Sequence, residues 1–236
     1  MFGQYTGTFR YESGDVLVEA ERIDGLLTYR RKCEGRAFER ILAISEAARV
    51  TVNPVEPVNL PKDITDLIQI EFTPVVLEPG ATQTIYLKFP VEIGVFLSSE
   101  KGIDILDIFG AGTQKYTLYG PPAGGLITRW CRSAVYPRAP PVERFREGVM
   151  ELSLLNTSSE WAHISCAVFN GANMRIFYND DIVAATATMK IISPTMAETS
   201  FIDIPLVPGM TRSVELHKAR KIRVISRGYL MEWGLS

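Results

Sequence analysis

The sequence predicts an all-β protein made of two tandem immunoglobulin-like antiparallel β-sandwich domains. Apolar and polar residues alternate with a period of two in many short runs, and turn residues separate these runs. In addition, residues 77–95 align without a gap on residues 206–224, where Leu, Pro, Gly, Thr, Leu, Ile and Val recur 129 positions later. An internal duplication explains this match and gives two units of ordinary domain size.

The alternation predicts the strands in order. In residues 14–22, Val16 and Val18 lie on one side and the residues between them on the other, as in a half-buried strand. Residues 85–89 and 91–97 repeat the pattern. Each run ends where the chain can reverse, because Gly adopts positive φ and Asn and Asp bond to nearby backbone. The predicted turns are Ser13-Gly14-Asp15, Asp24-Gly25, Pro79-Gly80, Gly110-Ala111-Gly112, Asn170-Gly171 and Pro208-Gly209.

One segment has conflicting signals. Residues 38–48 have helical propensity, but the residues aligned with them in the repeat, 161–171, have the composition of a strand. Because the copies of a duplicated domain share their elements, we expect a strand in both places.

The two predicted domains differ in charge. Residues 1–113 carry 11 Lys and Arg against 17 Asp and Glu, a net charge of −6, whereas residues 114–236 carry 14 against 10, a net charge of +4. We therefore expect an acidic domain over 1–113 and a basic domain over 114–236. Opposite charges favour packing of the two domains on each other, or association of molecules into a homo-oligomer.

The remaining composition excludes several classes. No run approaches the roughly 18 to 20 apolar residues of a transmembrane segment, and residues 1–15 lack the blocks of a signal peptide, so we expect a cytoplasmic protein. The three cysteines, Cys33, Cys131 and Cys166, are interpreted as reduced core thiols, with no metal site and no cofactor. With two His and no nucleophile motif, the sequence indicates no catalytic residues and does not predict an enzyme.

A basic stretch distinguishes the second unit from the first. Residues 217–227 contain five cations and no acid, while the aligned residues 88–98 contain one Lys and one Glu. One interpretation is an edge strand whose cations prevent aggregation. The other is a binding surface in a non-enzymatic protein-interaction or structural module, for a protein partner with an acidic surface; nucleic acid is less favoured because no recognised motif is present. The candidate residues are Lys218, Arg220, Lys221, Arg223 and Arg227.

Four aspartates support an alternative hypothesis. Asp104 and Asp107 precede one predicted turn, and Asp180 and Asp181 lie in another. Their simpler interpretation is turn formation, because Asp bonds to nearby backbone N–H groups. The alternative is a small-ligand or carbohydrate binder, or a hydrolase, that uses these carboxylates in a cleft between the domains.

Three motifs resemble a known family. They are MFGQYTG at the start, PRAPPVERFREGVMELSLLN over 137–156, and MRIFYND over 174–180 followed by IPLVPGMT over 204–211. With these motifs the chain is similar to an archaeal family of uncharacterised proteins, domain of unknown function 432. The resemblance extends over nearly the whole chain and implies a cytoplasmic archaeal protein. It implies no catalytic or binding residues.

Overall fold

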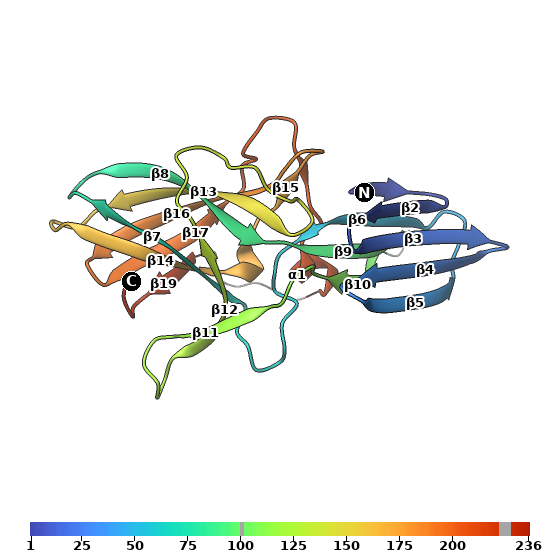
Figure 1. The fold of residues 1–236 in the computed structure, drawn as a ribbon, viewed down its shortest axis with the longest axis horizontal. Coiled ribbons are helices and arrows are strands. Elements are labelled where there is room, and N and C mark those ends of the chain that lie inside the picture. Colours follow the sequence, from blue (N-terminus) through green and yellow to red (C-terminus); the bar gives the residue numbers. More distant parts are fainter. Residues whose placement is uncertain (100–101, 222–227) are drawn as a thin grey trace.

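The computed structural model describes residues 1–99, 102–221 and 228–236 and consists of strands joined by turns. The described residues include one short α-helix, α1 (Leu216–Ala219), and one 3-10 turn, η1 (Gly171–Asn173). Most strand pairs are antiparallel. The prediction of an all-β protein is therefore confirmed. Figure 1 shows two groups of sheets arranged end to end along the long axis, with α1 between them.

The first group, which we call the first sandwich, contains two antiparallel sheets. One sheet follows chain order, and a second packs against it across a core that includes Val18, Tyr29, Val52 and Val95. The strands of the first sheet are β2 (Phe9–Ser13), β3 (Val16–Ile23), β4 (Leu26–Cys33) and β5 (Arg36–Ala43). Those of the second, in spatial order, are β1 (Gly3–Tyr5), β6 (Arg49–Val55), β9 (Glu92–Ser99) and β10 (Gly102–Phe109).

Local sequence explains the hairpins of the first sheet. Asp24-Gly25 and Glu34-Gly35 have positive φ at both residues, 50° and 80° in the first turn and 50° and 75° in the second. Two-residue turns of this kind match the twist of antiparallel strands, and Gly carries the second position without strain. The predicted turn at Asp24-Gly25 is confirmed.

The second group, the second sandwich, also contains two sheets, which pack around Ile70, Leu87, Leu152, Ile164 and Phe169. One sheet has the spatial order β11 (Lys115–Tyr119), β12 (Leu126–Ser133), β7 (Leu67–Leu77) and β14 (Ala162–Asn170). The other has the order β18 (Thr211–Arg212), β15 (Phe177–Tyr178), β16 (Val183–Ser193), β13 (Glu147–Asn156) and β8 (Thr82–Pro90), with β17 (Met196–Ile202) on β16 and β19 (Gly228–Met231) on β17.

Two strand pairs of the second sandwich are parallel, namely β7 with β12 and β13 with β16. A parallel pair needs a long connection, and both connections contain other strands. Between β7 and β12 the chain builds β9 and β10 of the first sandwich. The expectation of purely antiparallel sheets is therefore wrong at these two pairs.

The chain passes between the sandwiches more than once. Strands β7 and β8 lie before residue 113, yet they pair with β12, β13 and β14, which come after it. After β8 the chain returns to the first sandwich for β9 and β10. Strand pairing thus joins residues on both sides of residue 113, and the division into domains 1–113 and 114–236 stays a prediction.

The immunoglobulin-like duplication is not confirmed. Within the first aligned segment, residues 82–90 form β8 and residues 92–95 begin β9. In the described part of the second, residues 211–212 form the short strand β18 and residues 216–219 form the helix α1. The expectation of strands at 38–48 and 161–171 is confirmed by β5 and β14, although each strand differs from the expected range at its ends.

Candidate functional site

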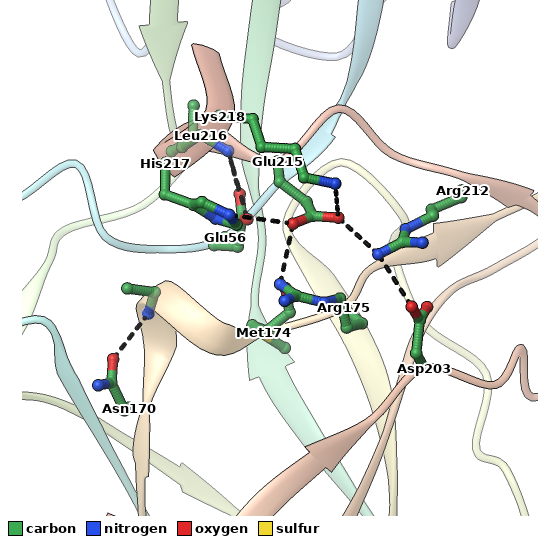
Figure 2. Close-up of polar contacts among 11 residues, drawn as sticks. Glu56, Asn170, Met174, Arg175, Asp203, Arg212, Glu215, Leu216, His217 and Lys218 are labelled. Carbon is green, nitrogen blue, oxygen red and sulfur yellow. Dashed lines mark hydrogen bonds and ion pairs between the residues drawn. The ribbon is translucent and has the colours of Figure 1, made fainter. Parts of the chain in front are cut away.

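A buried polar cluster occupies the junction between the two sandwiches. Glu56 follows β6 at the exit from the first sandwich, and Glu215 precedes α1. Figure 2 shows both carboxylates near the first turn of α1, with Arg175 and Arg212 reaching the carboxylate of Glu215. The cluster therefore combines residues far apart in the sequence at the place where the sandwiches meet.

Glu215 is surrounded by cations. Its Oε1 accepts hydrogen bonds from Arg212 Nη2 at 2.6 Å and Lys218 Nζ at 3.0 Å. Its Oε2 lies 3.0 Å from Arg175 Nη1 and 3.3 Å from His217 Nε2. Burial by itself would raise the pKa of Glu215, but the hydrogen bond from Lys218 and the nearby guanidinium charges outweigh burial and lower it. Glu215 is thus an ionised carboxylate, paired with cations at neutral pH.

Glu56 has the opposite environment. Its Oε2 accepts the Leu216 backbone N–H at 3.0 Å, which ties the start of α1 to the first sandwich. Burial raises the pKa of Glu56 to about 7, and the negative charge of Glu215 contributes to the rise. Glu56 therefore exchanges its proton near neutral pH, whereas Glu215 does not.

A pocket of about 410 Å³ opens beside this cluster. Ile103, Val214 and Ala219 supply apolar surface, and Lys218 and Lys221 are exposed at its rim. Lys221 makes no ion pair with any residue that the structure describes. The remaining lining residues are Arg212, Ser213 and Glu215. Ser213 is buried, and among the described residues its hydroxyl has no hydrogen-bond partner.

A second pocket, of about 510 Å³, shares Arg212 and Val214 with the first. Its lining is rich in amides and hydroxyls and includes two aromatic rings, Phe2 and Tyr178, whose centroids lie 5.3 Å apart. The other lining residues are Gly3, Gln4, Thr51, Asn53, Asn179, Asp180, Gly209 and Thr211. The junction thus presents a cationic, partly apolar pocket next to a mostly neutral polar one.

One comparison with known proteins gives a family. The family model described as "Protein of unknown function (DUF432)" matches residues 1–232. The chain belongs to DUF432. The resemblance seen in its sequence motifs is thereby confirmed. No curated protein and no solved structure matches the chain.

The structure of this DUF432 chain brings part of the predicted basic set together. Lys218, Arg220 and Lys221 lie in or just after α1, and Arg220 Nη2 donates to Asn59 Oδ1 at 2.9 Å. Arg223 and Arg227 lie outside the described residues. The edge-strand interpretation is wrong over 216–219, because a helical turn forms in which Ala219 N–H donates to the Glu215 carbonyl.

The four aspartates of the alternative hypothesis do not converge. Asp107 pairs with Arg31 at 2.7 Å inside the first sandwich, and Asp104, also on β10, lines a separate hollow with Ala48. Asp180 lines the second junction pocket, while Asp181 lies in the adjoining turn. Of the four, one therefore belongs to the junction, and no carboxylate pair forms.

Sequence reasoning missed Glu56, Arg175 and Glu215. One signal was available for Glu215, since this acid stands two residues before the basic stretch, at the spacing that lets it pair with Lys218 within one helical turn. Glu56 and Arg175 come from distant segments, and nothing local marks either as part of a cluster.

Other chemistry has little support among the described residues. Burial raises the pKa of the Cys131 and Cys166 thiols to about 12 and also raises that of Cys33, so none is an activated nucleophile. The described part of the chain contains no group of three or more His, Cys, Asp or Glu suited to a metal ion. No helix in that part is long and apolar enough to cross a membrane.

Proposed function

We propose that this protein is a non-enzymatic binding module that holds an acidic segment of a partner protein in the pocket beside α1. The observation that carries the proposal is the pocket itself, where the cations Arg212, Lys218 and Lys221 flank apolar surface at the junction of the sandwiches. The three unpaired cysteines suit a reducing, cytoplasmic compartment, which we include in the proposal.

The charge balance favours an anion. Among the residues that the structure describes around the pocket, the cations exceed the acids Glu56, Glu215 and Asp203 by two when every acid is ionised; the cations are Arg175, Arg212, Lys218, Arg220 and Lys221. Protonation of Glu56, whose pKa is about 7, increases this excess. Because Glu215 already has its own cations, its negative charge does not repel a ligand at the rim.

The apolar wall favours a protein segment over a bare inorganic anion. Ile103 and Val214 give no hydrogen bonds through their side chains, but they can pack against an apolar side chain of a peptide. The exposed lysines can pair with acidic side chains on either side of it. An acidic segment that carries one apolar anchor uses all of these features.

A peptide titration tests this proposal. We expect a fluorescein-labelled peptide of alternating Glu and Leu to bind in a salt-dependent manner, as measured by fluorescence polarisation, and a Glu–Ser peptide to bind more weakly. The double variant Lys218→Gln/Lys221→Gln should raise the Kd about tenfold, since two rim charges are lost. The matched control is Lys32→Gln/Lys62→Gln, which removes two lysines that do not line the pocket.

Two results would refute the proposal. One is an equal loss of binding in the control variant, which would indicate a non-specific charge effect. The other is a competition result. Inorganic polyphosphate or an anionic lipid vesicle would displace the labelled Glu–Leu peptide at a lower concentration than the unlabelled Glu–Leu peptide does. That result would place a non-protein anion in the pocket.

The second pocket favours a second candidate function, the binding of a neutral hydroxylated ligand such as a sugar. Its amides and hydroxyls both donate and accept hydrogen bonds, and its aromatic rings suit the apolar faces of sugars. We expect glucose or trehalose to raise the Tm, and Gln4→Ala to abolish the rise. The control is Gln83→Ala, an exposed glutamine on β8. A Tm unchanged by a panel of neutral mono- and disaccharides would exclude this candidate.

A further inference from the structure

The outer strand of the first sandwich, β5, has an open edge. The two-residue turn Glu34-Gly35 makes Cys33 and Arg36 a hydrogen-bonded pair, and bonded pairs then recur at every second residue. Residues 36, 38, 40 and 42 therefore direct their backbone N–H and C=O groups toward β4. Residues 37, 39, 41 and 43 direct theirs away from the sheet. No described residue forms a hydrogen bond with this outer row.

Other edge strands of similar length are covered or interrupted. On β8, Tyr86 exchanges two backbone hydrogen bonds with Tyr136. On β14, the Ser165 and Cys166 N–H groups donate to the Leu235 carbonyl. On β10, a bulge between Ile105 and Asp107 breaks the regular spacing. Open, regular edges pair readily with another strand, and β5 has eight residues of such an edge.

Apolar side chains lie beside this edge on the outer face of the sheet. Ile41 on β5 is 65% exposed, and its cross-strand neighbour is Thr28. Leu26 and Ile23, both exposed, face each other at the adjoining hairpin, and Leu26 lies opposite Ala43. The outer row of β5 itself contains one charge, Glu39, which is already paired with Arg30 at 3.1 Å. β5 contains no lysine, no proline and no bulge, and its two arginines, Arg36 and Arg40, lie outside the outer row.

We propose that a second copy of this chain pairs its β5 antiparallel with this β5, forming a homodimer with one continuous sheet. A twofold axis at Ile41 places the two Ile41 side chains opposite each other, Glu39 opposite Ala43 of the second copy, and Arg40 opposite Leu42. No like charges then face each other. An axis at Glu39 or Arg40 would oppose identical charges, which disfavours those registers.

The pairing forms about six backbone hydrogen bonds between the two copies, and it also brings the apolar outer faces of their sheets into contact. It leaves the junction pockets free, because β5 lies at the lower margin of the first sandwich in Figure 1, and it lines neither pocket. The dimer is therefore independent of the proposed binding function. An edge contact of this size is expected to give a reversible, concentration-dependent dimer.

Analytical ultracentrifugation of the full chain tests the inference. The protein should sediment as a monomer–dimer equilibrium, and Ile41→Lys should raise the dimer Kd at least about tenfold. Ile41→Pro is a sharper variant, since it removes an N–H that faces the open edge and leaves the hydrogen bonds to β4 in place. The control is Ile204→Lys, an isoleucine 58% exposed in the loop before β18.

Each outcome decides the proposal. Loss of the dimer in both Ile41 variants, with unchanged circular dichroism and an unchanged dimer in Ile204→Lys, supports it. A monomeric wild-type chain at the highest attainable concentration would overturn it. So would a dimer that persists in a folded Ile41→Pro variant or dissociates equally in Ile204→Lys.

Discussion

Replacing Arg129 with Met is expected to lower the free energy of unfolding by about 3–5 kcal/mol. Arg129 on β12 is 5% exposed and Glu92 at the start of β9 is 1% exposed, with Nη1 and Oε1 2.5 Å apart. Asn59 N–H and Gln114 Nε2 also donate to Glu92. Burial raises the pKa of Glu92 even beside Arg129, so without Arg129 the buried carboxyl either keeps an unpaired charge or takes up a proton, and both cost stability. The Met side chain retains most of the packing, so the loss reports on the ion pair together with the hydrogen bond from Arg129 to the Pro57 carbonyl, 2.9 Å long.

A double-mutant cycle separates this effect from general disruption. Glu92→Met/Arg129→Met leaves no buried charge at this pair and should be less destabilised than Arg129→Met alone, as measured by urea unfolding at neutral pH. As a control, Arg10→Met removes ion pairs with Glu12 and Glu19 in which Arg10 is 60% exposed, and it should lower stability far less than Arg129→Met, because solvent screens exposed pairs. Equal destabilisation of the single and double variants would show that the charge is not the cause.

Replacing Glu56 with Gln is expected to change how stability depends on pH. Burial raises the pKa of Glu56 from 4.5 to about 7 in the folded protein, so folding favours the protonated form. The stabilisation by that proton is complete below pH 4.5 and disappears as the pH rises through 7. The shift corresponds to about 3 kcal/mol. Glutamine stays neutral and can still accept the Leu216 N–H, so the variant should gain stability relative to wild type over this range.

Urea unfolding from about pH 5 to about pH 8 measures this difference. Burial lowers the pKa of His217, so the contribution of His217 to the free energy of unfolding increases with pH. Because His217 is present in both proteins, this contribution cancels in the comparison. Glu215, whose pKa is lowered, acts below 4.5 and lies outside the range. The control is Glu46→Gln, at an exposed glutamate. A wild-type–variant difference that is constant across this range would contradict the prediction.

The sequence predicts the strands of this protein better than their pairing. Alternation around Val16 and Val18 and the Asp24-Gly25 turn are local signals, and the structure confirms both. The repeat of Pro79-Gly80 at Pro208-Gly209 is also local, but a turn alone does not determine the element that comes after it. Strands β8 and β9 come after the first turn, whereas β18 and α1 come after the second. Pairing depends on contacts between distant residues, which alternation does not encode.

The candidate site shows the same limit. The basic residues Lys218 and Lys221 are visible as a run of charge, and the structure places both at a pocket. The acid that pairs with Lys218, Glu215, is close to it in sequence, but Glu56 is 160 residues away from the Leu216 N–H that it binds. A buried carboxylate of this kind is recognised by its surroundings, because its local sequence is that of an ordinary surface residue.

The passage of the chain from β6 to β7 and β8 and back to β9 affects how the protein folds during synthesis. Strands β7 and β8 leave the ribosome well before their partners β12, β13 and β14. The apolar faces of these two strands, which include Ile70 and Leu87, therefore stay exposed until the later partner strands are synthesised. Non-local pairing of this kind slows folding and prolongs the lifetime of aggregation-prone intermediates. Nascent chains that end near residue 113 are accordingly the ones that chaperones should hold longest.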